Sequence, residues 1–404
     1  MQLTETVSGV LSDRIVSLSE SQTIAMAKKA RELVAKGIDV INLSFGEPDF
    51  QTPQYIKDAA KQAIDDGFTF YTPVAGYPEL RQAIADKLKR DNNLDYKPEN
   101  IVVSTGAKQA IANAVMCLVN PGDEVLIFSP YWVSYEEIVK LAEGIPVQVV
   151  GKIENNYKVT AQQLEDAITS NTKLVMYSSP CNPTGSVFTK EELEAFARIL
   201  EKHPQVHIIA DEIYEYINFS GKHHSMAGFD FIKDRVITVN GFSKGYAMTG
   251  WRVGYLAASK EIADACDKMQ SQITSGTCSI AQKAAVGALK GGKESAEMMT
   301  EAYKRRRDLV LDLLKEIPEI KTYVPEGAFY IFPDVSAFFG KSWEDYQIND
   351  SMDLSMFLLN DANVALVSGD AFGASQCIRF SFAASDEKLT EAMKRIKTSL
   401  AKLA

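Results

Sequence analysis

Short apolar runs that each end in polar or aromatic residues recur through the middle of the chain. They are DEVLIFSPYW (123–132), KLVMYSSPCNPTG (173–185), VHIIADEIYEY (206–216) and RVITVNGFSK (235–244). Runs that are apolar on both faces are typical of parallel strands covered by helices on both sides. Ligands of such sheets bind beyond the carboxyl ends of the strands, where these polar tips fall. The pattern therefore predicts an α/β fold with a ligand site at one edge of the sheet.

The two chain ends carry a different pattern, which predicts a smaller second unit. Its predicted elements are a helix over 21–37, strands over 327–336 and 377–385, and a helix over 386–403. Ser21 is a candidate N-cap of the first helix, and Gly37 is a typical stop. We expect a large domain over residues 49–289 and a small domain built from residues 1–48 and 290–404.

Composition narrows the class of protein. With 404 residues, of which 46% are hydrophobic, the chain can bury the cores of two domains. Its net charge of -10 argues against nucleic acid, which binds basic surfaces. The five cysteines are scattered, so we expect neither a disulfide framework nor a cysteine-rich zinc site. The N-terminus lacks an apolar signal core and no run is long enough to cross a bilayer, so a reduced, cytoplasmic protein is expected.

Lys244 stands in a setting that a surface lysine does not need. It follows an apolar run, and Gly241 and Gly245 leave space around its side chain. A desolvated lysine has a lowered pKa, and its neutral amine can form an imine with an aldehyde. Arg252, eight positions later, offers a planar fork that suits a phosphate group.

Other strand tips offer partners for a planar ligand. Asp211 follows a buried strand, and a carboxylate there would keep a heterocyclic nitrogen protonated. Tyr214 could donate to an oxygen of the same ring. Two prolines stiffen the loop that carries Asn182, so its amide is aimed reproducibly at a ligand oxygen. Trp132 offers an aromatic face for stacking.

A glycine turn completes this set of candidates. STGAKQA (104–110) leads from a predicted strand into a helix, and the N–H groups of Gly106 and Ala107 can bind an anion at the positive helix end. Each segment alone also suits an ordinary cap, turn or packing role. Together the candidates predict a pyridoxal 5′-phosphate site, because they include a lysine for an imine, an arginine for a phosphate, an aspartate for a ring nitrogen and an aromatic ring for stacking.

The ordered motifs resemble those of a known family along nearly the whole chain. They are LSFGEPDF, FYTPVAGYPELR, STGAKQA, SPYWVSY, SSPCNPTG, ADEIYE, NGFSKGYAMTGWRVGY, PEGAFY and IRFSFA. The chain is similar to the class I aminotransferases among the fold-type-I pyridoxal-phosphate enzymes, most of all to the bacterial-type aspartate aminotransferases. The resemblance implies a large domain with a mostly parallel central sheet between helices, and a smaller α+β domain. It also implies a homodimer with active sites at the subunit interface.

The resemblance implies roles for residues at matching positions. Lys244 matches the lysine that forms the imine and then carries the proton between the substrate Cα and the cofactor. Asp211 matches the partner of the pyridine nitrogen, and Arg379 matches the arginine that binds the substrate α-carboxylate. The other matches are Asn182 and Tyr214 at the ring oxygen, Trp132 on the ring face, Arg252 and the Gly106–Lys108 turn (Gly106, Ala107, Lys108) at the phosphate, Tyr71 at the phosphate of the neighbouring subunit, and Gly46 beside the substrate.

Two positions depart from the pattern of the family. Cys181 stands where relatives often carry Asn or another small residue, and we expect no loss of chemistry because Asn182 is retained. Gly241 stands where some relatives offer a phosphate-binding hydroxyl, so that contact is not expected here.

The implied reaction is a ping-pong transamination between an amino acid and a 2-oxo acid. In this subgroup the lysine matching Lys108, assisted by a residue matching Thr23, binds a distal carboxylate, so L-aspartate and 2-oxoglutarate are the expected substrates. The same two residues occur in relatives that transaminate prephenate, so a glutamate/aspartate–prephenate aminotransferase is an alternative. A pyridoxal-phosphate C–S β-lyase would use the same cofactor residues and also stays open. A DNA-binding regulator of this fold is disfavoured, because the motifs begin by residue 40.

A metal enzyme is not expected. His203 and His207 are four residues apart, which in a strand separates them by about 13 Å. His223 and His224 fall in a polar loop with no metal-ligand grouping near them in the sequence. We therefore interpret these histidines as structural or surface residues.

Overall fold

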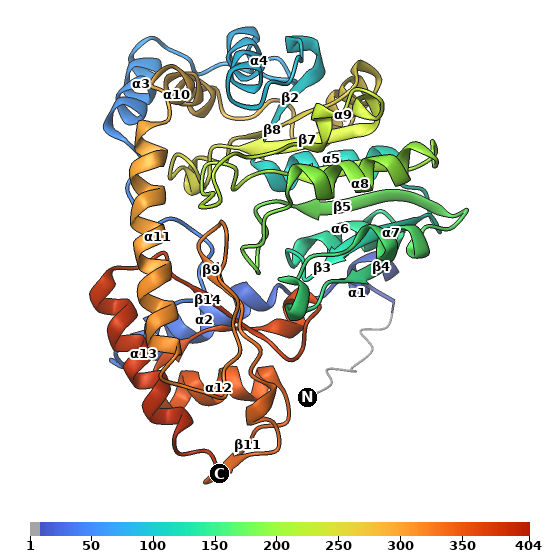
Figure 1. Ribbon diagram of the computed structural model, residues 1–404. Helices are drawn as coiled ribbons and strands as arrows, with labels where there is room; N and C mark the ends of the chain where they lie inside the picture. Colours follow the sequence, from blue (N-terminus) through green and yellow to red (C-terminus); the bar gives the residue numbers. More distant parts are fainter. Residues whose placement is uncertain (1–8) are drawn as a thin grey trace.

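A seven-stranded sheet forms the middle of the larger part of the molecule (Figure 1). The computed structural model describes residues 9–404. In spatial order the strands are β2 (Ile101–Ser104), β8 (Gly254–Ala257), β7 (Val236–Gly241), β6 (His207–Asp211), β5 (Thr172–Ser178), β3 (Glu124–Ser129) and β4 (Ile145–Val150). The strand β8 runs antiparallel to the other six strands, which are parallel to one another. The carboxyl ends of the parallel strands therefore meet at one edge.

Helices cover both faces of this sheet because its strands are apolar on both sides. In β6, Ile209 packs into the core on one face, and Ile208 and Ala210 pack into the core on the other. The first face is covered by α5 (Ala107–Leu118), α6 (Ser134–Leu141) and α9 (Lys260–Ile273). The second is covered by α3 (Gln54–Asp65), α4 (Pro78–Asn92), α7 (Ala161–Ala167), α8 (Lys190–Glu201) and α10 (Ser279–Lys290).

The long helix α11 (Glu294–Leu314) leads from this part to a smaller one, drawn below it in Figure 1. The smaller part joins the two chain ends, because β1 pairs in parallel with β12 and Ile41 lies opposite Val364. Its central sheet has the order β13-β14-β9 and is antiparallel. The elements of the two ends are α1 (Asp13–Val16), α2 (Gln22–Ala35), β1 (Ile41–Asn42), β9 (Tyr330–Ile331), β10 (Ser342–Trp343), β11 (Tyr346–Gln347), α12 (Ser351–Asp361), β12 (Val364–Ala365), β13 (Val367–Ser368), β14 (Ile378–Ser381) and α13 (Asp386–Leu400).

The predicted fold class is confirmed: a mainly parallel sheet lies between helices. The helix predicted over 21–37 is α2, and Gly37 follows it with φ +84°. Ser21 takes the N-cap position as predicted, although its side chain makes no capping hydrogen bond. The domain boundaries at 49 and 289 stay predictions, and residues 1–8 of the predicted small domain lie outside the described residues.

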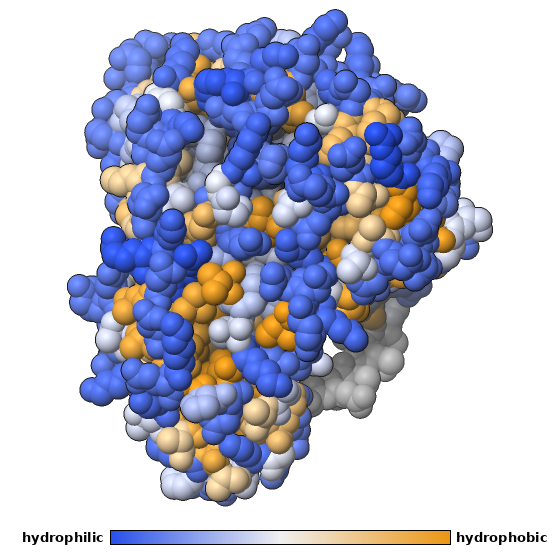
Figure 2. Space-filling view, in the orientation of Figure 1, coloured by the Kyte–Doolittle hydropathy of each residue, from blue (hydrophilic) through white to orange (hydrophobic). Residues whose placement is uncertain are grey.

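The visible surface of the molecule is mostly hydrophilic. On the face seen in Figure 2, hydrophilic residues cover most of the surface, and hydrophobic residues form smaller groups between them. Within residues 9–404, we find no helix that is both long enough and apolar enough to span a bilayer.

Candidate active site

The carboxyl ends of β5 and β6 and the segment after β7 open onto a cavity of about 470 Å³. Residues of α2, β9 and β14 close it from the smaller part of the molecule. The predicted site residues that line it are Thr23, Gly46, Ala107, Lys108, Trp132, Asn182, Asp211, Tyr214, Lys244, Arg252 and Arg379. Residues from sequence positions 23 to 379 thus meet at the predicted edge of the sheet.

Lys244 lies three residues beyond β7 and points its ammonium group at the backbone carbonyl of Gly46. The rings of Tyr214 and Phe329 flank it, with centroids 5.6 and 5.7 Å from Nζ. Burial lowers the pKa of Lys244 to about 8, and the guanidinium of Arg379 acts in the same direction. The amine is therefore far easier to deprotonate than that of a surface lysine.

Asp211 is the last residue of β6, and its carboxyl group is buried. Burial raises its pKa to about 6, and two hydrogen bonds partly offset this rise. The Tyr135 hydroxyl donates to Oδ2 at 2.7 Å, and the backbone N–H of Ile213 donates to Oδ1 at 3.2 Å. Tyr135 was not among the residues predicted from the sequence, although its position three residues after Trp132 was a usable signal. The two hydrogen bonds thus orient the carboxylate, and a cationic ligand beside it would favour its ionised form.

Arg379 is a buried guanidinium that connects two parts of the site. It belongs to β14, and its Nη1 donates to Asn182 Oδ1 at 2.9 Å while Nη2 donates to the Ser44 carbonyl at 2.7 Å. Its Nε has no hydrogen-bond partner among the described residues. An arginine with an unused buried donor, at the wall of a cavity, can still accept a carboxylate ligand.

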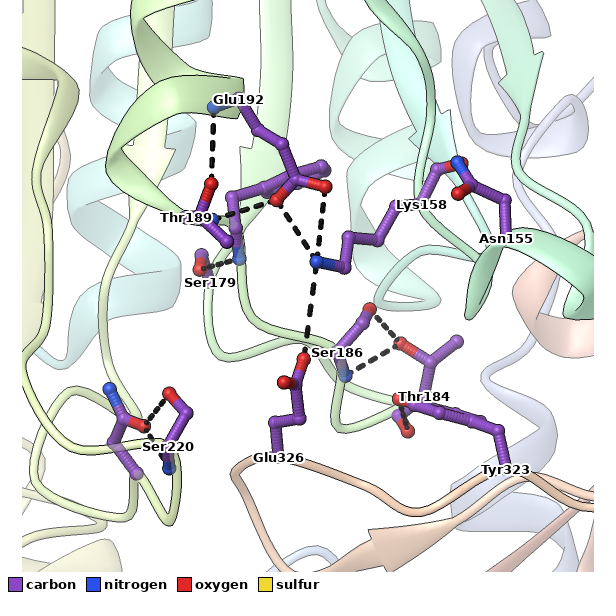
Figure 3. Close-up of polar contacts among 12 residues, drawn as sticks. Asn155, Lys158, Ser179, Thr184, Ser186, Thr189, Glu192, Ser220, Tyr323 and Glu326 are labelled. Atoms are coloured by element: carbon purple, nitrogen blue, oxygen red, sulfur yellow. Dashed lines mark hydrogen bonds and ion pairs between the residues drawn. The ribbon is translucent and has the colours of Figure 1, made fainter.

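The loop that carries Asn182 is held from the smaller part of the molecule, as Figure 3 shows. The Tyr323 hydroxyl donates to the Thr184 carbonyl. The N–H groups of Glu326 and Gly327 each donate to the Gly185 carbonyl at 2.9 Å. A second tie in the same view is Lys158, whose Nζ lies 2.9 Å from Glu192 and 4.0 Å from Glu326. The neighbouring Cys181 is buried, which raises the pKa of its thiol and makes it a poor nucleophile. The loop therefore holds Asn182 rigidly.

A positively charged corner lies at the start of α5. Gly106 has φ +83°, and a Cβ there would lie 2.3 Å from Arg252 Nη2, so only glycine lets the guanidinium approach this turn. Arg252 donates to the Thr249 carbonyl at 2.9 Å and the Thr105 carbonyl at 3.3 Å. A Cβ at Gly241 would lie 2.9 Å from the Cα of Gly254, which explains why no hydroxyl side chain is present at that position. The corner suits an anion bound by backbone N–H groups and a guanidinium.

Lys108 and Trp132 lie together at the cavity wall, with Lys108 Nζ 4.9 Å from the indole centroid. Burial and the neighbouring Arg252 lower the pKa of Lys108. Thr23 faces the same cavity from α2. Tyr71 is 99% exposed and is not among the residues that line the cavity. Within one chain the structure therefore leaves Tyr71 out of the site.

The sequence predicted no group of possible metal ligands near His223, but the fold brings one together. Its Nε2 lies 3.0 Å from Glu212 Oε2, and possible metal-ligand atoms of His223, Glu212 and Glu215 lie within 4.8 Å of one another. Glu215 is already paired with the buried ammonium of Lys87 and accepts a 2.8 Å hydrogen bond from Asn92. Burial opposes a charge on His223, but the Glu212 carboxylate raises its pKa. Two carboxylates thus face the Lys87 ammonium and an imidazole whose pKa is raised, which is typical of a buried polar cluster with a structural role.

Comparison with known proteins gives a consistent result. Residues 38–396 match the family model described as aminotransferase class I and II. The chain is 48% identical over 403 residues to an aspartate/prephenate aminotransferase of Cereibacter sphaeroides, covering 97% of this chain and 99% of that protein. It is 47% identical to a bifunctional aspartate aminotransferase and glutamate/aspartate-prephenate aminotransferase of Petunia hybrida, covering 96% of this chain and 82% of that protein.

Solved structures agree with these relatives. The aspartate aminotransferase of Rhizobium meliloti superimposes with a TM-score of 0.94 at 41% identity, over 98% of this chain and 100% of that chain. The aspartate aminotransferase of Thermus thermophilus with maleate superimposes with a TM-score of 0.91 at 40% identity, over 97% of this chain and 100% of that chain.

Proposed function

Since this chain belongs to the aminotransferases of class I and II, we propose that it transfers the amino group of L-aspartate to 2-oxoglutarate with pyridoxal 5′-phosphate as cofactor. The observation that carries the proposal is the meeting of a half-buried lysine with a lowered pKa, a buried aspartate and a buried arginine at one cavity. These three are Lys244, Asp211 and Arg379.

The residues present fit this cofactor. The raised pKa of Asp211 reflects the cost of a buried negative charge, and a protonated pyridine nitrogen would compensate that charge. Ser178 Oγ and Arg379 Nε are buried polar atoms that lack partners among residues 9–404, and both side chains belong to the cavity wall. The Gly106 turn and Arg252 offer the N–H groups and the charge that a phosphate requires.

When bound, the cofactor supplies an aldehyde for covalent attachment and a ring that accepts electrons from the substrate. Lys244 would hold the cofactor and act as the base that removes the substrate Cα proton, a contribution of about 10²–10⁴-fold to the rate. Asp211 would keep the ring nitrogen protonated. Arg379 binds the substrate α-carboxylate, because its fork is buried and already oriented by Asn182 and Ser44.

The remaining predicted residues would orient the reacting groups. Asn182 and Tyr214 would donate to the ring oxygen, Trp132 would stack on the ring, and Arg252 with the Gly106 turn would bind the phosphate. These roles are the ones that the family resemblance implies, and all of these residues except Gly106 line the cavity.

Lys108 and Thr23 are the proposed partners of the distal carboxylate of the substrate. Both line the cavity, and the cationic head of Lys108 lies above the Trp132 ring. Prephenate also carries a distal carboxylate, and relatives at 48% and 47% identity are named for both substrates. A glutamate/aspartate–prephenate aminotransferase activity is therefore the second candidate.

A homodimer in a cytoplasmic setting belongs to the same proposal. Phe70 and Tyr71 are 82% and 99% exposed, which is unusual for neighbouring large aromatic side chains. A second copy of the chain that covers them would bring Tyr71 to the phosphate corner of its partner.

The test is the near-ultraviolet and visible absorption of the protein saturated with pyridoxal 5′-phosphate. The wild type should show a band that the Lys244→Ala variant lacks, that L-aspartate bleaches and that 2-oxoglutarate restores. A Lys108→Met variant is the matched control: it should keep the band but need more aspartate to bleach it. A wild type without the lysine-dependent band would refute the proposal.

The same absorption assay tests which substrate the enzyme uses. A band that aspartate leaves unchanged, but that glutamate bleaches and prephenate restores, would favour the second candidate. Release of pyruvate from cystathionine would favour a C–S β-lyase.

A further inference from the structure

Tyr330 is a cavity residue that the sequence analysis mentioned only as part of the PEGAFY motif. It begins β9, lies opposite Ser381 of β14 and is fully buried against the cavity wall. Its hydroxyl lies 2.7 Å from that of Tyr214, and its ring centroid lies 4.5 Å from the guanidinium carbon of Arg379. One phenol therefore contacts both the proposed carboxylate-binding arginine and a proposed donor to the ring oxygen.

Its hydroxyl also lies close to Gly46, whose carbonyl accepts a hydrogen bond from the Lys244 ammonium group. A Cβ at Gly46 would lie 2.8 Å from the Tyr330 oxygen, so glycine is needed for this approach. The phenol is thus fixed between three groups of the site, and its hydroxyl is held at a defined position beside Tyr214.

The proposed function gives the hydrogen bond between the two phenols a direction. Each hydroxyl has one proton, and at 2.7 Å either phenol could donate to the other. If the Tyr214 proton serves the ring oxygen, only the Tyr330 proton is left for the bond between the phenols. Tyr330 is then the donor and Tyr214 the acceptor.

We propose that Tyr330 is a positioning residue: it donates to Tyr214 and thereby directs the Tyr214 proton at an anionic oxygen in the cavity. The inference rests on the proposed function, in which that oxygen is the ring oxygen of the cofactor. A hydroxyl that accepts a hydrogen bond becomes a better donor, because consecutive hydrogen bonds polarise one another. Tyr330 thus acts on the cofactor through Tyr214.

A packing role alone makes a different prediction. Tyr330 belongs to an aromatic cluster with Phe329 and Tyr303. The ring centroids of Tyr330 and Phe329 lie 4.8 Å apart, and those of Phe329 and Tyr303 lie 5.2 Å apart. Phenylalanine at position 330 keeps the ring and its contacts and removes only the hydroxyl. If Tyr330 serves packing alone, the Tyr330→Phe variant leaves the electronic state of the bound cofactor unchanged.

The experiment is a pH titration of the visible band of bound pyridoxal 5′-phosphate in a double-mutant cycle. Donation to the ring oxygen favours the form in which that oxygen is negative, so losing the donor raises the pKa of the band. Tyr214→Phe should raise it, and Tyr330→Phe should raise it by about a tenth to a third as much. In the Tyr214→Phe background, Tyr330→Phe should have no further effect.

Tyr303→Phe is the matched control. Tyr303 is buried in the same cluster, and its hydroxyl has no hydrogen-bond partner among the described residues. Its variant should titrate like the wild type. An unshifted Tyr330→Phe variant, or an equal shift with and without the Tyr214 hydroxyl, would overturn the inference while the proposed function stands. A wild type without any lysine-dependent band would overturn both.

Discussion

The hydrogen bond from Tyr135 to Asp211 leads to a quantitative prediction about the ionisation of the site. Tyr135→Phe keeps the buried ring, which lies edge-on to Trp132 at 5.5 Å, and removes the hydroxyl that donates to Asp211 at 2.7 Å. The Asp211 carboxylate then keeps the backbone N–H of Ile213 as a donor, at 3.2 Å. Because the lost bond is stronger to the ionised carboxylate than to the protonated carboxyl group, the pKa of Asp211 must rise.

The size of the rise follows from the strength of such a bond. A hydrogen bond to a charged group contributes about 1.5–3 kcal/mol, and one pKa unit corresponds to about 1.4 kcal/mol. The pKa of Asp211, about 6 with the bond in place, should therefore rise by about 1–2 units without it. At pH 7.5 the protonated fraction would grow from roughly 3% to between about a quarter and three quarters. A protonated Asp211 no longer compensates a charged ring nitrogen.

The assay is a titration of the Asp211 carboxyl in the cofactor-free protein, by carbon-13 NMR of labelled aspartate with Asp211→Asn to assign the signal. Tyr177→Phe is the control, because Tyr177 lies on the adjacent strand β5, is buried and has a hydroxyl with no partner among residues 9–404. With cofactor and substrate, the acidic limb of the rate profile should move to higher pH in Tyr135→Phe. An unchanged midpoint for Asp211 in that variant would refute the reasoning.

Two further predictions test the phosphate corner and the buried ion cluster. Gly106→Ala should weaken binding of pyridoxal 5′-phosphate about tenfold or more, because alanine is strained at a φ of +83° and its Cβ would lie 2.3 Å from Arg252. The control is Gly122→Ala, which has a similar φ of +87° but open space around it, and it should bind the cofactor normally in the same absorption titration. Equal affinities for the two variants would contradict this reading. The free energy of unfolding of His223→Gln should be lower than that of the wild type by about 1.5–3 kcal/mol. The full difference is present below the ordinary histidine pKa of 6.5 and shrinks as the pH rises through the raised pKa of the folded state, because a raised pKa means that protonation stabilises the fold. Thermal unfolding from pH 5.5 to 9 measures this, with His224→Gln as control, and a pH-independent difference would count against it.

Much of the site could be predicted from the sequence because of where its residues fall on the strands. Lys244 and Asp211 each follow a short apolar run, and parallel strands bring such tips to one edge. The glycine turn at Gly106 was equally visible, because it joins a strand to a helix. These signals are local, and the regular geometry of a parallel sheet converts them into a common location.

The pairings between side chains were beyond the sequence. Arg379 and Asn182 are 197 positions apart, and Tyr330 and Tyr214 are 116 apart. His223 looked like a loop residue, yet the fold places it beside Glu212. Such contacts depend on how the two parts of the molecule pack, which no local pattern encodes.

The sequence by itself thus determined the class of fold, the strand tips that carry the chemistry and the family of the enzyme. The tertiary structure decided which groups share hydrogen bonds and how strongly each is buried. Burial in turn sets the pKa values of Lys244 and Asp211, because removing water penalises the charged form of a group unless a partner compensates it. A residue type can be read from the chain, but its surroundings exist only once the chain has folded.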